Sequence, residues 1–517
     1  MGKGACDMTK KWPAKEACRT RLLGNRPGRK SAGATGVRTM PCLLILLAGL
    51  LGACAVNPVT GERQLAFISE SQEIALGQQG AAEVRQSMAL VQDQALQDYV
   101  ERLGLKLAAA SERPDLPWSF AVVDDPVPNA FALPGGPVFV TRGLLTLMDS
   151  EAELVSVLGH EIGHITARHS VAQMSRAQLA QLGLGLGTIF VPEVRPYGEL
   201  ASSGLSLLLL KYGRDAERQA DTLGFKYAQS QGYDTREMAD VFAALQQSAE
   251  LAGQSAIPNW MASHPAPQER IEAVQRRLAE QSGHGLDSTV GRADFLGQID
   301  GLAYGENPRQ GFFREGVFYH PELRFRFQLP EDWQRQNLAQ AVVGLSPQQN
   351  AAFQFSLATA PSAEQAFRQF ASQQGLQVGR PDATEVNGIP AMSAVFQAQT
   401  QQGITTGIAT FYELEQRVYQ LVTYARIDSF DSYRPTFEAI IESFAAVDDP
   451  DILEVQPATV EIVELPRAMS FNEFVRWSDS TINADQLALI NQIQSRSDII
   501  PAGTLLKQVK GGVGGGA

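Results

Sequence analysis

The pentapeptide His160-Glu161-Ile162-Gly163-His164 constrains this 517-residue chain more than any other stretch. Residues four apart in an α-helix lie on one face, so the two histidines can bind the same metal ion. The acid that follows the first histidine is then placed to act as a general base on a water molecule. A catalytic zinc site usually has three protein ligands and an open fourth position. The pattern therefore predicts a catalytic zinc site on a helix.

The helix that carries this motif is predicted to be buried and to begin at Ser150. Residues 152–165 are largely apolar, and a helix that is hydrophobic all round is normally buried. Two imidazoles and a carboxylate in such a helix need polar partners, which a metal ion supplies. Two solvated histidines on an exposed helix are the alternative. Ser150 and Glu153 have the spacing of a capping box, with Ser at the N-cap and Glu at N3.

A second acidic motif, Glu217-Arg218-Gln219-Ala220-Asp221, contains the natural third ligand. It lies in a helix expected from about residue 215 to 231, ended by a glycine. Glu217 and Asp221 are four apart and share a face, and the small residues Ala220 and Gly224 allow another helix to approach closely. We expect Glu217 to bind zinc and Asp221 to accept a hydrogen bond from a ligating histidine. A solvated acidic helix face is the alternative.

Three short strands are expected before the metal helix, at 118–123, 131–133 and 138–141, the last two joined by a Pro-Gly-Gly turn. A strand next to an active site can pair with the extended backbone of a peptide substrate. An ordinary edge strand is the alternative. The residues that we assign to a substrate-binding strand are Asn129, Gly136, Val138 and Val140.

These motifs resemble one family of zinc peptidases, the family that includes the membrane heat-shock protease HtpX and the CAAX prenyl endopeptidase. The opening 57–65 is similar to its branch of bacterial periplasmic lipoprotein peptidases. The resemblance covers about residues 55–280 and implies a mainly helical gluzincin fold with a small sheet. Where the family often has Ser-Arg before the acidic motif, this chain has Gly213-Arg214, which leaves the ligands unchanged. The resemblance rests on 129–145, 160–170, 214–224, Ser263-His264-Pro265 and Arg270-Ile271.

The resemblance also gives a role to His264, because a histidine at this point of the family lies near the zinc. His264 either occupies the fourth zinc position at rest or donates a hydrogen bond to the oxyanion. His169 is nine residues from His160 and half a turn out of phase on a continuous helix, so it is expected to face away and to be structural. His284 and His320 are expected at the surface.

The net charge of −13 divides into +8 for residues 1–40 and −21 for the remainder. A body this acidic does not attract nucleic acid through its general field, so no nucleic-acid partner is expected. Two apolar runs, 182–190 and 205–210, are too short to span a bilayer. They are expected to form a buried hairpin, with a cap over the cleft or a contact with lipid as alternatives.

The four cysteines, Cys6, Cys18, Cys42 and Cys54, all precede the folded body, which excludes a disulfide framework and a thiolate zinc site there. An apolar run of signal-peptide length ends in Leu51-Gly52-Ala53-Cys54, which resembles the lipobox of bacterial lipoproteins. We expect Cys54 to be lipidated, with anchoring to the outer membrane. A chance cysteine after an apolar run is the alternative. Residues 1–36 do not look like a signal peptide, so the true start is expected near 37–40.

The chain has room for about three domains. We expect a leader and signal peptide over 1–53, a mainly α, zincin-type peptidase domain with a small β-sheet over 54–300, and an α+β domain over 301–448. An acidic linker, 449–464, is followed by a small βααβ module over 465–512. The α+β domain weakly resembles PsbP/Mog1-like domains, and the last module resembles LysM-type modules, which makes peptidoglycan a further expected partner.

Together these features predict a zinc-dependent endopeptidase of the bacterial cell envelope, with one Zn²⁺ per chain. Its expected substrates are misfolded or envelope proteins, cleaved in quality control in the periplasm. The alternative from another class is a non-catalytic envelope scaffold or chaperone that binds peptidoglycan or outer-membrane proteins. A complete set of ligands together with the base Glu161 favours the enzyme, because a scaffold has no need of a base.

Overall fold

The computed structural model describes residues 54–181, 212–252, 260, 263–264, 267–280, 288–338, 340–400 and 403–512. The expected leader and signal peptide, the two apolar runs at 182–190 and 205–210, and His284 lie outside these residues. Within the described part of the chain, no helix combines the length and the apolar character that crossing a membrane requires.

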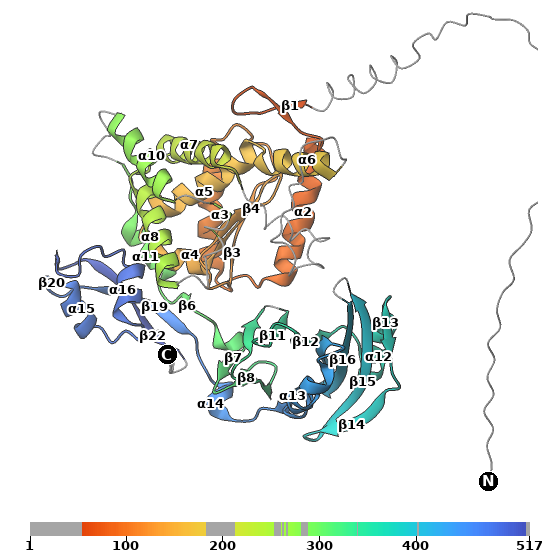
Figure 1. Cartoon of the computed structure of the whole chain (residues 1–517). Coiled ribbons are helices and arrows are strands. Elements are labelled where there is room, and N and C mark those ends of the chain that lie inside the picture. The colour runs from red at the N-terminus through yellow and green to blue at the C-terminus, as the bar shows by residue number, and fades with distance from the viewer. Residues whose placement is uncertain are drawn as a thin grey trace, which may run out of the picture. The chain divides into compact units, whose positions relative to one another are not determined.

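The N-terminal part of the body consists of helices around a small sheet (Figure 1). A short hairpin of β1 (Cys54–Val56) and β2 (Arg63–Leu65) precedes them. The helices are α2 (Glu70–Ser87), α3 (Gln94–Ala108), α4 (Arg142–Leu147), α5 (Glu151–Thr166), α6 (His169–Gln181), α7 (Arg214–Ser230), α8 (Glu237–Ala252), α10 (Pro267–Glu280) and α11 (Arg292–Ile299).

The three strands expected before the metal helix form one mixed sheet of order β3-β5-β4. They are β3 (Ser119–Val123), β4 (Ala130–Ala132) and β5 (Pro137–Thr141). β5 is the central strand, parallel to β3 and antiparallel to β4. The assignment of Val138 and Val140 to a substrate-binding strand is therefore wrong, because both are buried in β5 and paired on both sides. Among the described residues, the strand near the metal helix with one edge unpaired is β4.

The metal helix α5 is buried from Ala152 to Thr166, as its apolar composition predicts. It begins after Ser150, whose side chain accepts a hydrogen bond from the backbone N–H of Glu153. The reciprocal half of the expected capping box is shifted by one residue, because the Glu153 carboxylate accepts from the N–H of Asp149 at 2.6 Å. Both contacts satisfy backbone groups that a helix start leaves without partners.

Helices α5 and α7 cross in backbone contact, because small residues line both of them. A Cβ atom on Gly159 would lie 3.1 Å from the Cα of Gly224, and one on Gly224 would lie 2.8 Å from the backbone nitrogen of His160. Gly163 meets Ala220 in the same way. The close helix approach predicted from Ala220 and Gly224 is confirmed, and it carries the acidic motif to the histidines.

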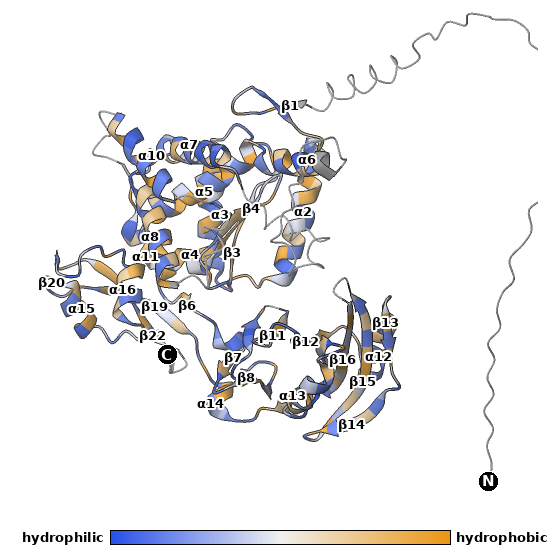
Figure 2. Cartoon of the chain, viewed as in Figure 1, coloured by the Kyte–Doolittle hydropathy of each residue, from blue (hydrophilic) through white to orange (hydrophobic). Residues whose placement is uncertain are grey.

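The α+β domain is built on an eight-stranded antiparallel sheet of order β10-β11-β12-β17-β16-β15-β13, with β14 also paired to β15. Neighbouring residues of one strand point to opposite faces: Phe411 packs in the cluster with helix α12, and Tyr412 in the cluster with α13. Figure 2 shows the resulting change of hydropathy along the long strands. These elements are β10 (Gln334–Asn337), β11 (Ala341–Leu345), β12 (Ala351–Ala358), α12 (Ala363–Ala371), β13 (Leu376–Val378), β14 (Asp382–Val386), β15 (Ile389–Thr400), β16 (Gly403–Leu414), β17 (Arg417–Arg426) and α13 (Phe430–Glu442).

A second, four-stranded sheet completes this domain in the order β18-β9-β8-β7. Its strands are β7 (Phe312–Arg314), β8 (Val317–His320), β9 (Phe325–Gln328) and β18 (Ala445–Ala446). A short 3-10 helix, η4 (Pro308–Gln310), precedes it, and helix α14 (Pro450–Leu453) follows it. His320, expected at the surface, is half-buried in β8, and its Nδ1 accepts a hydrogen bond from the N–H of Leu323.

The α+β domain is inserted between two strands of another sheet. β6 (Ala303–Tyr304) pairs with β19 (Ala458–Glu464), which also pairs with β22 (Leu505–Gly511). The prediction that 449–464 is a linker is therefore wrong, since half of this segment is a strand. The remaining elements are β20 (Met469–Ser470), α15 (Phe471–Trp477), α16 (Ala484–Ile490) and β21 (Ile499–Ile500). With β22, residues 465–512 have the order βααββ, one strand more than the predicted βααβ.

The C-terminal module, 458–511, shares one hydrophobic core with the helical part of the chain. Polar contacts extend this interface to the start of the metal helix. The ammonium of Lys507 is fully buried, donates to the carbonyls of Thr146 and Met148, and lies 2.8 Å from Asp149 Oδ1. Gln492 donates to the carboxylate of Glu153 at 2.9 Å. The module is therefore built into the fold rather than attached to it.

Replacing Lys507 with Met is expected to lower the free energy of unfolding by up to about 3–5 kcal/mol, because it leaves the buried carboxylate of Asp149 with Arg292 as its remaining cation. Urea unfolding followed by tryptophan fluorescence measures the change. Lys510→Met in the same strand is the matched control, since Lys510 pairs with the exposed Asp479 and its loss should cost less than about 1 kcal/mol. Equal effects of the two substitutions would show that the buried contact contributes nothing particular.

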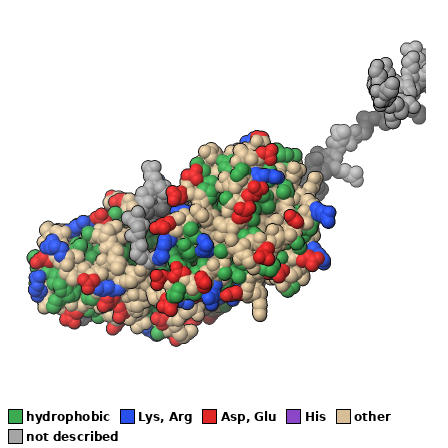
Figure 3. All heavy atoms as spheres, turned by 90° about the horizontal axis from the view of Figure 1, so that it is seen from below, with side chains coloured by type: hydrophobic (Ala, Val, Ile, Leu, Met, Phe, Trp, Pro, Cys, Tyr) green, Lys and Arg blue, Asp and Glu red, His purple; other side chains and the backbone are tan. Residues whose placement is uncertain are grey.

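Acidic and basic side chains are interspersed on the face of the molecule shown in Figure 3, and neither sign forms a continuous field there.

The hairpin β1–β2 contacts the end of the metal helix. Asn57 Nδ2 and Gln64 Nε2 both donate to the carbonyl of Ala167, at 3.4 and 3.3 Å. Cys54, in β1, is therefore three residues away from a contact with the C-cap of α5.

Candidate metal centre and active site

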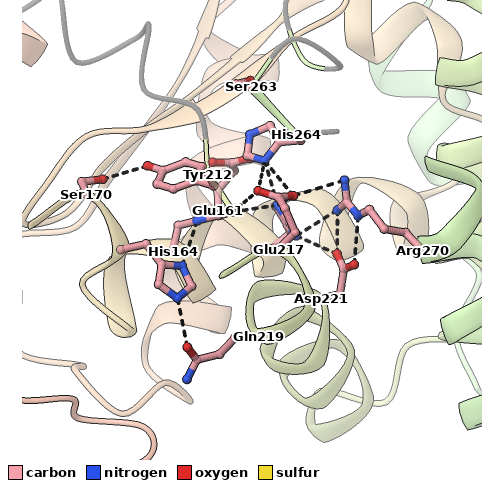
Figure 4. A network of polar contacts seen from close by, with 12 residues as sticks. Glu161, His164, Ser170, Tyr212, Glu217, Gln219, Asp221, Ser263, His264 and Arg270 are labelled. Atoms are coloured by element: carbon pink, nitrogen blue, oxygen red, sulfur yellow. Dashed lines mark hydrogen bonds and ion pairs between the residues drawn. The ribbon is translucent and has the colours of Figure 1, made fainter. Parts of the chain in front are cut away.

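The predicted ligands converge at the crossing of α5 and α7. Nε2 of His160 lies 3.0 Å from Nε2 of His164, and the carboxylate of Glu217 lies 3.5–3.6 Å from these two nitrogens. His264 joins them, with Nδ1 3.2 Å from His160 Nε2 and 3.0 Å from Glu217 Oε1. Figure 4 shows the Glu217 carboxylate facing the His264 ring. One ligand atom from each of the four side chains lies within 4.8 Å of the others.

The chemistry of this cluster fits a metal ion. All four side chains are buried, and three imidazoles with one carboxylate form a donor set typical of zinc. Glu161, the predicted base, lies beside the cluster with 1% of its surface exposed. Among the described residues, none donates a hydrogen bond to its Oε1, and His264 Nε2 is 3.6 Å away. A buried carboxylate oxygen without a partner is costly unless a ligand or water meets it.

Burial and neighbouring charges set the protonation of the metal-free cluster. Burial lowers the pKa of His164, and the neighbouring His160 lowers it further, so its imidazole is held neutral as metal binding requires. His264 differs, because the carboxylates of Glu217 and Glu161 outweigh its burial and raise its pKa. Burial alone would raise the pKa of Glu217, but His264 and His160 hold it below its usual value. Glu217 and His264 therefore form an ion pair, with His264 Nδ1 at 3.0 Å from Glu217 Oε1.

Asp221 lies beside His160, where the sequence predicted a partner for that histidine. Its Oδ1 lies 2.9 Å from Nδ1 of His160, and Arg270 donates two hydrogen bonds to the same carboxylate. Burial raises the pKa of Asp221, but Arg270 and His160 outweigh it and hold the pKa well below its usual range. A permanent carboxylate at this position keeps the proton of His160 on Nδ1 and leaves Nε2 free for a metal.

Arg270, Trp260 and Tyr212 also contact the cluster, although the sequence analysis predicted no role for them. The guanidinium of Arg270 contacts the rings of both Phe242 and Trp260, at 4.1 and 4.6 Å from their centroids. Trp260 also stacks on His264 at 4.9 Å. Tyr212 packs on the ring of His164 at 3.9 Å, and its hydroxyl bonds to that of Ser170 at 2.8 Å. Arg270 stood among the family motifs, but nothing in the local sequence marks Trp260 or Tyr212.

The prediction that His169 faces away from the site is wrong. It assumed that the metal helix continues through residue 169, but α5 ends at Thr166. Arg168 follows in the left-handed region, with φ of 58°, and turns the chain into α6. This turn brings Nδ1 of His169 to 3.0 Å from Nδ1 of His164. Arg168 is held there by Glu73, which accepts from its Nε at 2.8 Å.

A helix pair that presents two histidines, a glutamate and an adjacent buried carboxylate is the arrangement expected of a metallopeptidase domain. Residues 94–278 match the model of Peptidase family M48, so this domain belongs to that family. The resemblance noted from the motifs is confirmed. Membership of the family implies a metal in the site, with which the cluster of three histidines and one glutamate agrees.

Three relatives illustrate the likeness. The chain is 30% identical over 257 residues to the Beta-barrel assembly-enhancing protease of Yersinia pestis, covering 48% of this chain and 52% of that protein. It is 28% identical over 229 residues to the protein of that name from Escherichia coli K12, covering 43% and 46%. It is 31% identical over 185 residues to the Mitochondrial metalloendopeptidase OMA1 of Schizosaccharomyces pombe, covering 35% and 53%.

The chain spans about half the length of the curated relatives that it matches. Among solved structures, a cyanobacterial PsbP from Synechocystis matches with a TM-score of 0.22 and 14% identity. It covers 25% of this chain and 91% of that one. Because the score is this low, the PsbP-like assignment stays a prediction. The LysM-like assignment stays a prediction as well. The chain combines a metallopeptidase domain with a separate β-rich region.

Proposed function

We propose that this protein is a zinc-dependent endopeptidase of the bacterial cell envelope, with one zinc per chain. The observation that carries the proposal is the convergence of four buried ligand atoms beside the carboxylate of Glu161, whose Oε1 receives no hydrogen bond from the described residues. A scaffold or chaperone, the alternative class, has no use for a buried carboxylate of this kind. Hydrolysis of casein by the purified protein, abolished by a zinc chelator, is the result that the proposal requires. Casein left intact by the zinc-loaded protein would contradict it.

Each residue of the cluster has a distinct role in this proposal. His160, His164 and Glu217 would hold the ion. Bound zinc supplies Lewis-acid chemistry, since it lowers the pKa of water and polarises a carbonyl group. Glu161 takes a proton from the attacking water and later returns it to the leaving amine. Its buried position favours this role, because an oxygen without a hydrogen-bond donor is free to accept that proton.

His264 retains two roles. Its Nδ1 lies among the ligand atoms, which supports a fourth ligand in the resting protein. Its raised pKa, which the carboxylates of Glu217 and Glu161 cause against the effect of burial, supports a cationic donor to the oxyanion during the reaction. The two roles are compatible if His264 is displaced when a substrate enters.

We also propose that an extended substrate pairs with the free edge of β4 (Ala130–Ala132). This strand contacts α5 and replaces β5 in the predicted role. Asn129 lies at its start, with a buried Oδ1 that no described residue satisfies. The tight turn at Gly135 and Gly136, both with positive φ, joins β4 to the central strand. Gly136 therefore shapes the turn in this proposal.

The proposed location is the periplasm, with a lipid anchor at Cys54 in the outer membrane. The lipobox-like sequence supports it, and the contacts of Asn57 and Gln64 with Ala167 would place that anchor close to the catalytic helix. The proposed substrates are misfolded or envelope proteins, since two of the relatives are named for enhancing β-barrel assembly. We further propose that residues 465–512 bind peptidoglycan, supported by the succession β20-α15-α16-β21 at the start of this segment and tested by co-sedimentation with purified sacculi.

Replacing Cys54 with Ser is expected to abolish acylation, because the hydroxyl cannot form the thioether that a lipobox cysteine forms. Metabolic labelling with a fatty acid, followed by membrane fractionation, measures this. The variant should carry no label and should leave the membrane fraction, whereas Cys42→Ser should behave as the wild type. Fatty acid incorporated into the Cys54→Ser protein would show that the lipobox assignment is wrong.

A further inference from the structure

The Nδ1 atoms of His160 and His164, which point away from the other ligand atoms, have different partners. This difference leads to an inference that rests on the proposed zinc site. Nε2 of His164 faces the other ligand atoms, 3.0 Å from Nε2 of His160 and 3.5 Å from Glu217 Oε1. A neutral imidazole that binds a metal through Nε2 carries its proton on Nδ1. Nδ1 of His164 is therefore a donor, and the atom 3.0 Å from it must accept.

That atom is Nδ1 of His169. Two ring nitrogens can share a hydrogen bond only when one carries the proton and the other has a lone pair. His169 must then be neutral and carry its own proton on Nε2. Its Nε2 lies 3.0 Å from Oε1 of Gln219, an atom that can only accept.

We propose that Gln219 and His169 form a hydrogen-bond relay that sets the tautomer of the metal ligand His164. The amide oxygen of Gln219 accepts from Nε2 of His169, and Nδ1 of His169 accepts from Nδ1 of His164. The three groups belong to different helices, since His164 lies in α5, His169 starts α6, and Gln219 follows the ligand Glu217 by two residues in α7. His169 and Gln219 are positioning residues, because they act on the metal through His164.

The relay gives His164 an uncharged partner where His160 has the carboxylate of Asp221. The buried site already contains three carboxylates, of Glu161, Glu217 and Asp221. A fourth carboxylate, placed beside His164, would add a buried negative charge. Among the described residues, no second arginine is placed to pair with it as Arg270 pairs with Asp221. A neutral ring therefore orients the ligand without that electrostatic cost. Partners of this kind typically change metal affinity by about 10–100-fold.

The test inverts the polarity of the relay at Gln219, whose side chain is only half-buried, so the fold should persist. In the full chain, Gln219→Lys places a donor opposite Nε2 of His169, which forces the proton of His169 onto Nδ1 and sets two donors against each other. Zinc affinity, measured by competition with a chelating dye at pH 8, should fall by about 10–100-fold. Gln219→Glu keeps an acceptor opposite Nε2 of His169 and should bind zinc more tightly than Gln219→Lys. Gln231→Lys adds the same charge at the half-buried C-cap of α7, far along the helix from the ligands, and should have no effect.

A spectroscopic readout separates the relay from a general loss of structure. In the zinc-loaded chain labelled with ¹⁵N-histidine, NMR should show the His169 proton on Nε2 and the His164 proton on Nδ1. A His169 proton on Nδ1, or zinc binding in Gln219→Lys as tight as in the wild type, would overturn the relay alone. A wild-type chain that takes up no zinc would overturn the proposed function together with the relay. The two failures are thus distinguishable.

Discussion

Replacing Glu161 with Gln is expected to reduce peptide hydrolysis by about 10²–10⁴-fold, because the substitution removes the general base. The amide matches the carboxylate in size, and the zinc ligands are unchanged. Metal content and fold should therefore persist in the variant. Rates of casein cleavage, compared with zinc content measured on the same samples, test this expectation.

The same variant separates an enzyme from a scaffold inside the cell. A protease that needs Glu161 cannot complement a deletion strain as the Gln variant, whereas a scaffold can. Glu153→Gln is a useful control, since Glu153 is a buried acid of the same helix but contacts Asp149 and Gln492 instead of the cluster. Full complementation by zinc-loaded, peptidase-dead Glu161→Gln would contradict a proteolytic role in the cell, even if the wild type cleaves casein in vitro.

The second large effect is on the metal. His160→Ala and Glu217→Ala should each lose the stoichiometric zinc of the purified mature chain, because both remove a ligand at the helix crossing. Asp221→Ala should have a smaller effect and lower the zinc affinity by about 10–100-fold, because Asp221 orients His160 and does not itself bind the metal. Elemental analysis of the purified variants measures the content. His320→Ala, which alters a histidine of the α+β domain, is the control and should keep one zinc per chain.

If the Glu217→Ala variant retained its zinc, His264 would be the first residue to test as the replacement ligand. Its Nδ1 lies 3.0 Å from Glu217 Oε1, so His264 is the nearest group that could replace the lost carboxylate. Stoichiometric zinc in the Glu217→Ala chain, lost again in a double variant with His264→Ala, would make His264 the third ligand. This outcome would correct the ligand set while leaving the metal centre in place.

The parts of the site that could be predicted from sequence are those governed by helical periodicity. His160 and His164, and Glu217 and Asp221, are four-residue pairs, and each pair shares a face whatever surrounds it. Ala220 and Gly224 marked the helix contact because only small residues allow backbones to touch. The ligands therefore followed from spacing and residue size, two properties that can be read from a single sequence.

Features that depend on where a helix ends were missed. His169 was placed on the far side because the helix was extended past Thr166, and nothing in the sequence announces a non-glycine residue such as Arg168 with positive φ. Its conformation depends on Glu73, about a hundred residues earlier, which periodicity cannot reveal. Val138 and Val140 were misassigned for a similar reason, since strand order in a sheet is set by tertiary contacts.

One predicted domain boundary, the linker at 449–464, was also wrong for a physical reason. The acidic stretch 449–464 was interpreted as a linker because charged residues are frequent there, yet β19 pairs with β6 and β22 through its backbone. Backbone pairing tolerates charged side chains on an exposed face. The burial of Lys507 against Asp149 was also unpredictable, because a lysine in a C-terminal strand is normally exposed.

The most direct test of the central claim is the hydrolysis of casein by the metal-free mature chain as zinc is added back. If the cluster of His160, His164 and Glu217 is a catalytic zinc site, activity should rise in proportion to added zinc and reach its maximum at one zinc per chain. Hydrolysis by the metal-free chain, or none at one bound zinc per chain, would contradict the account.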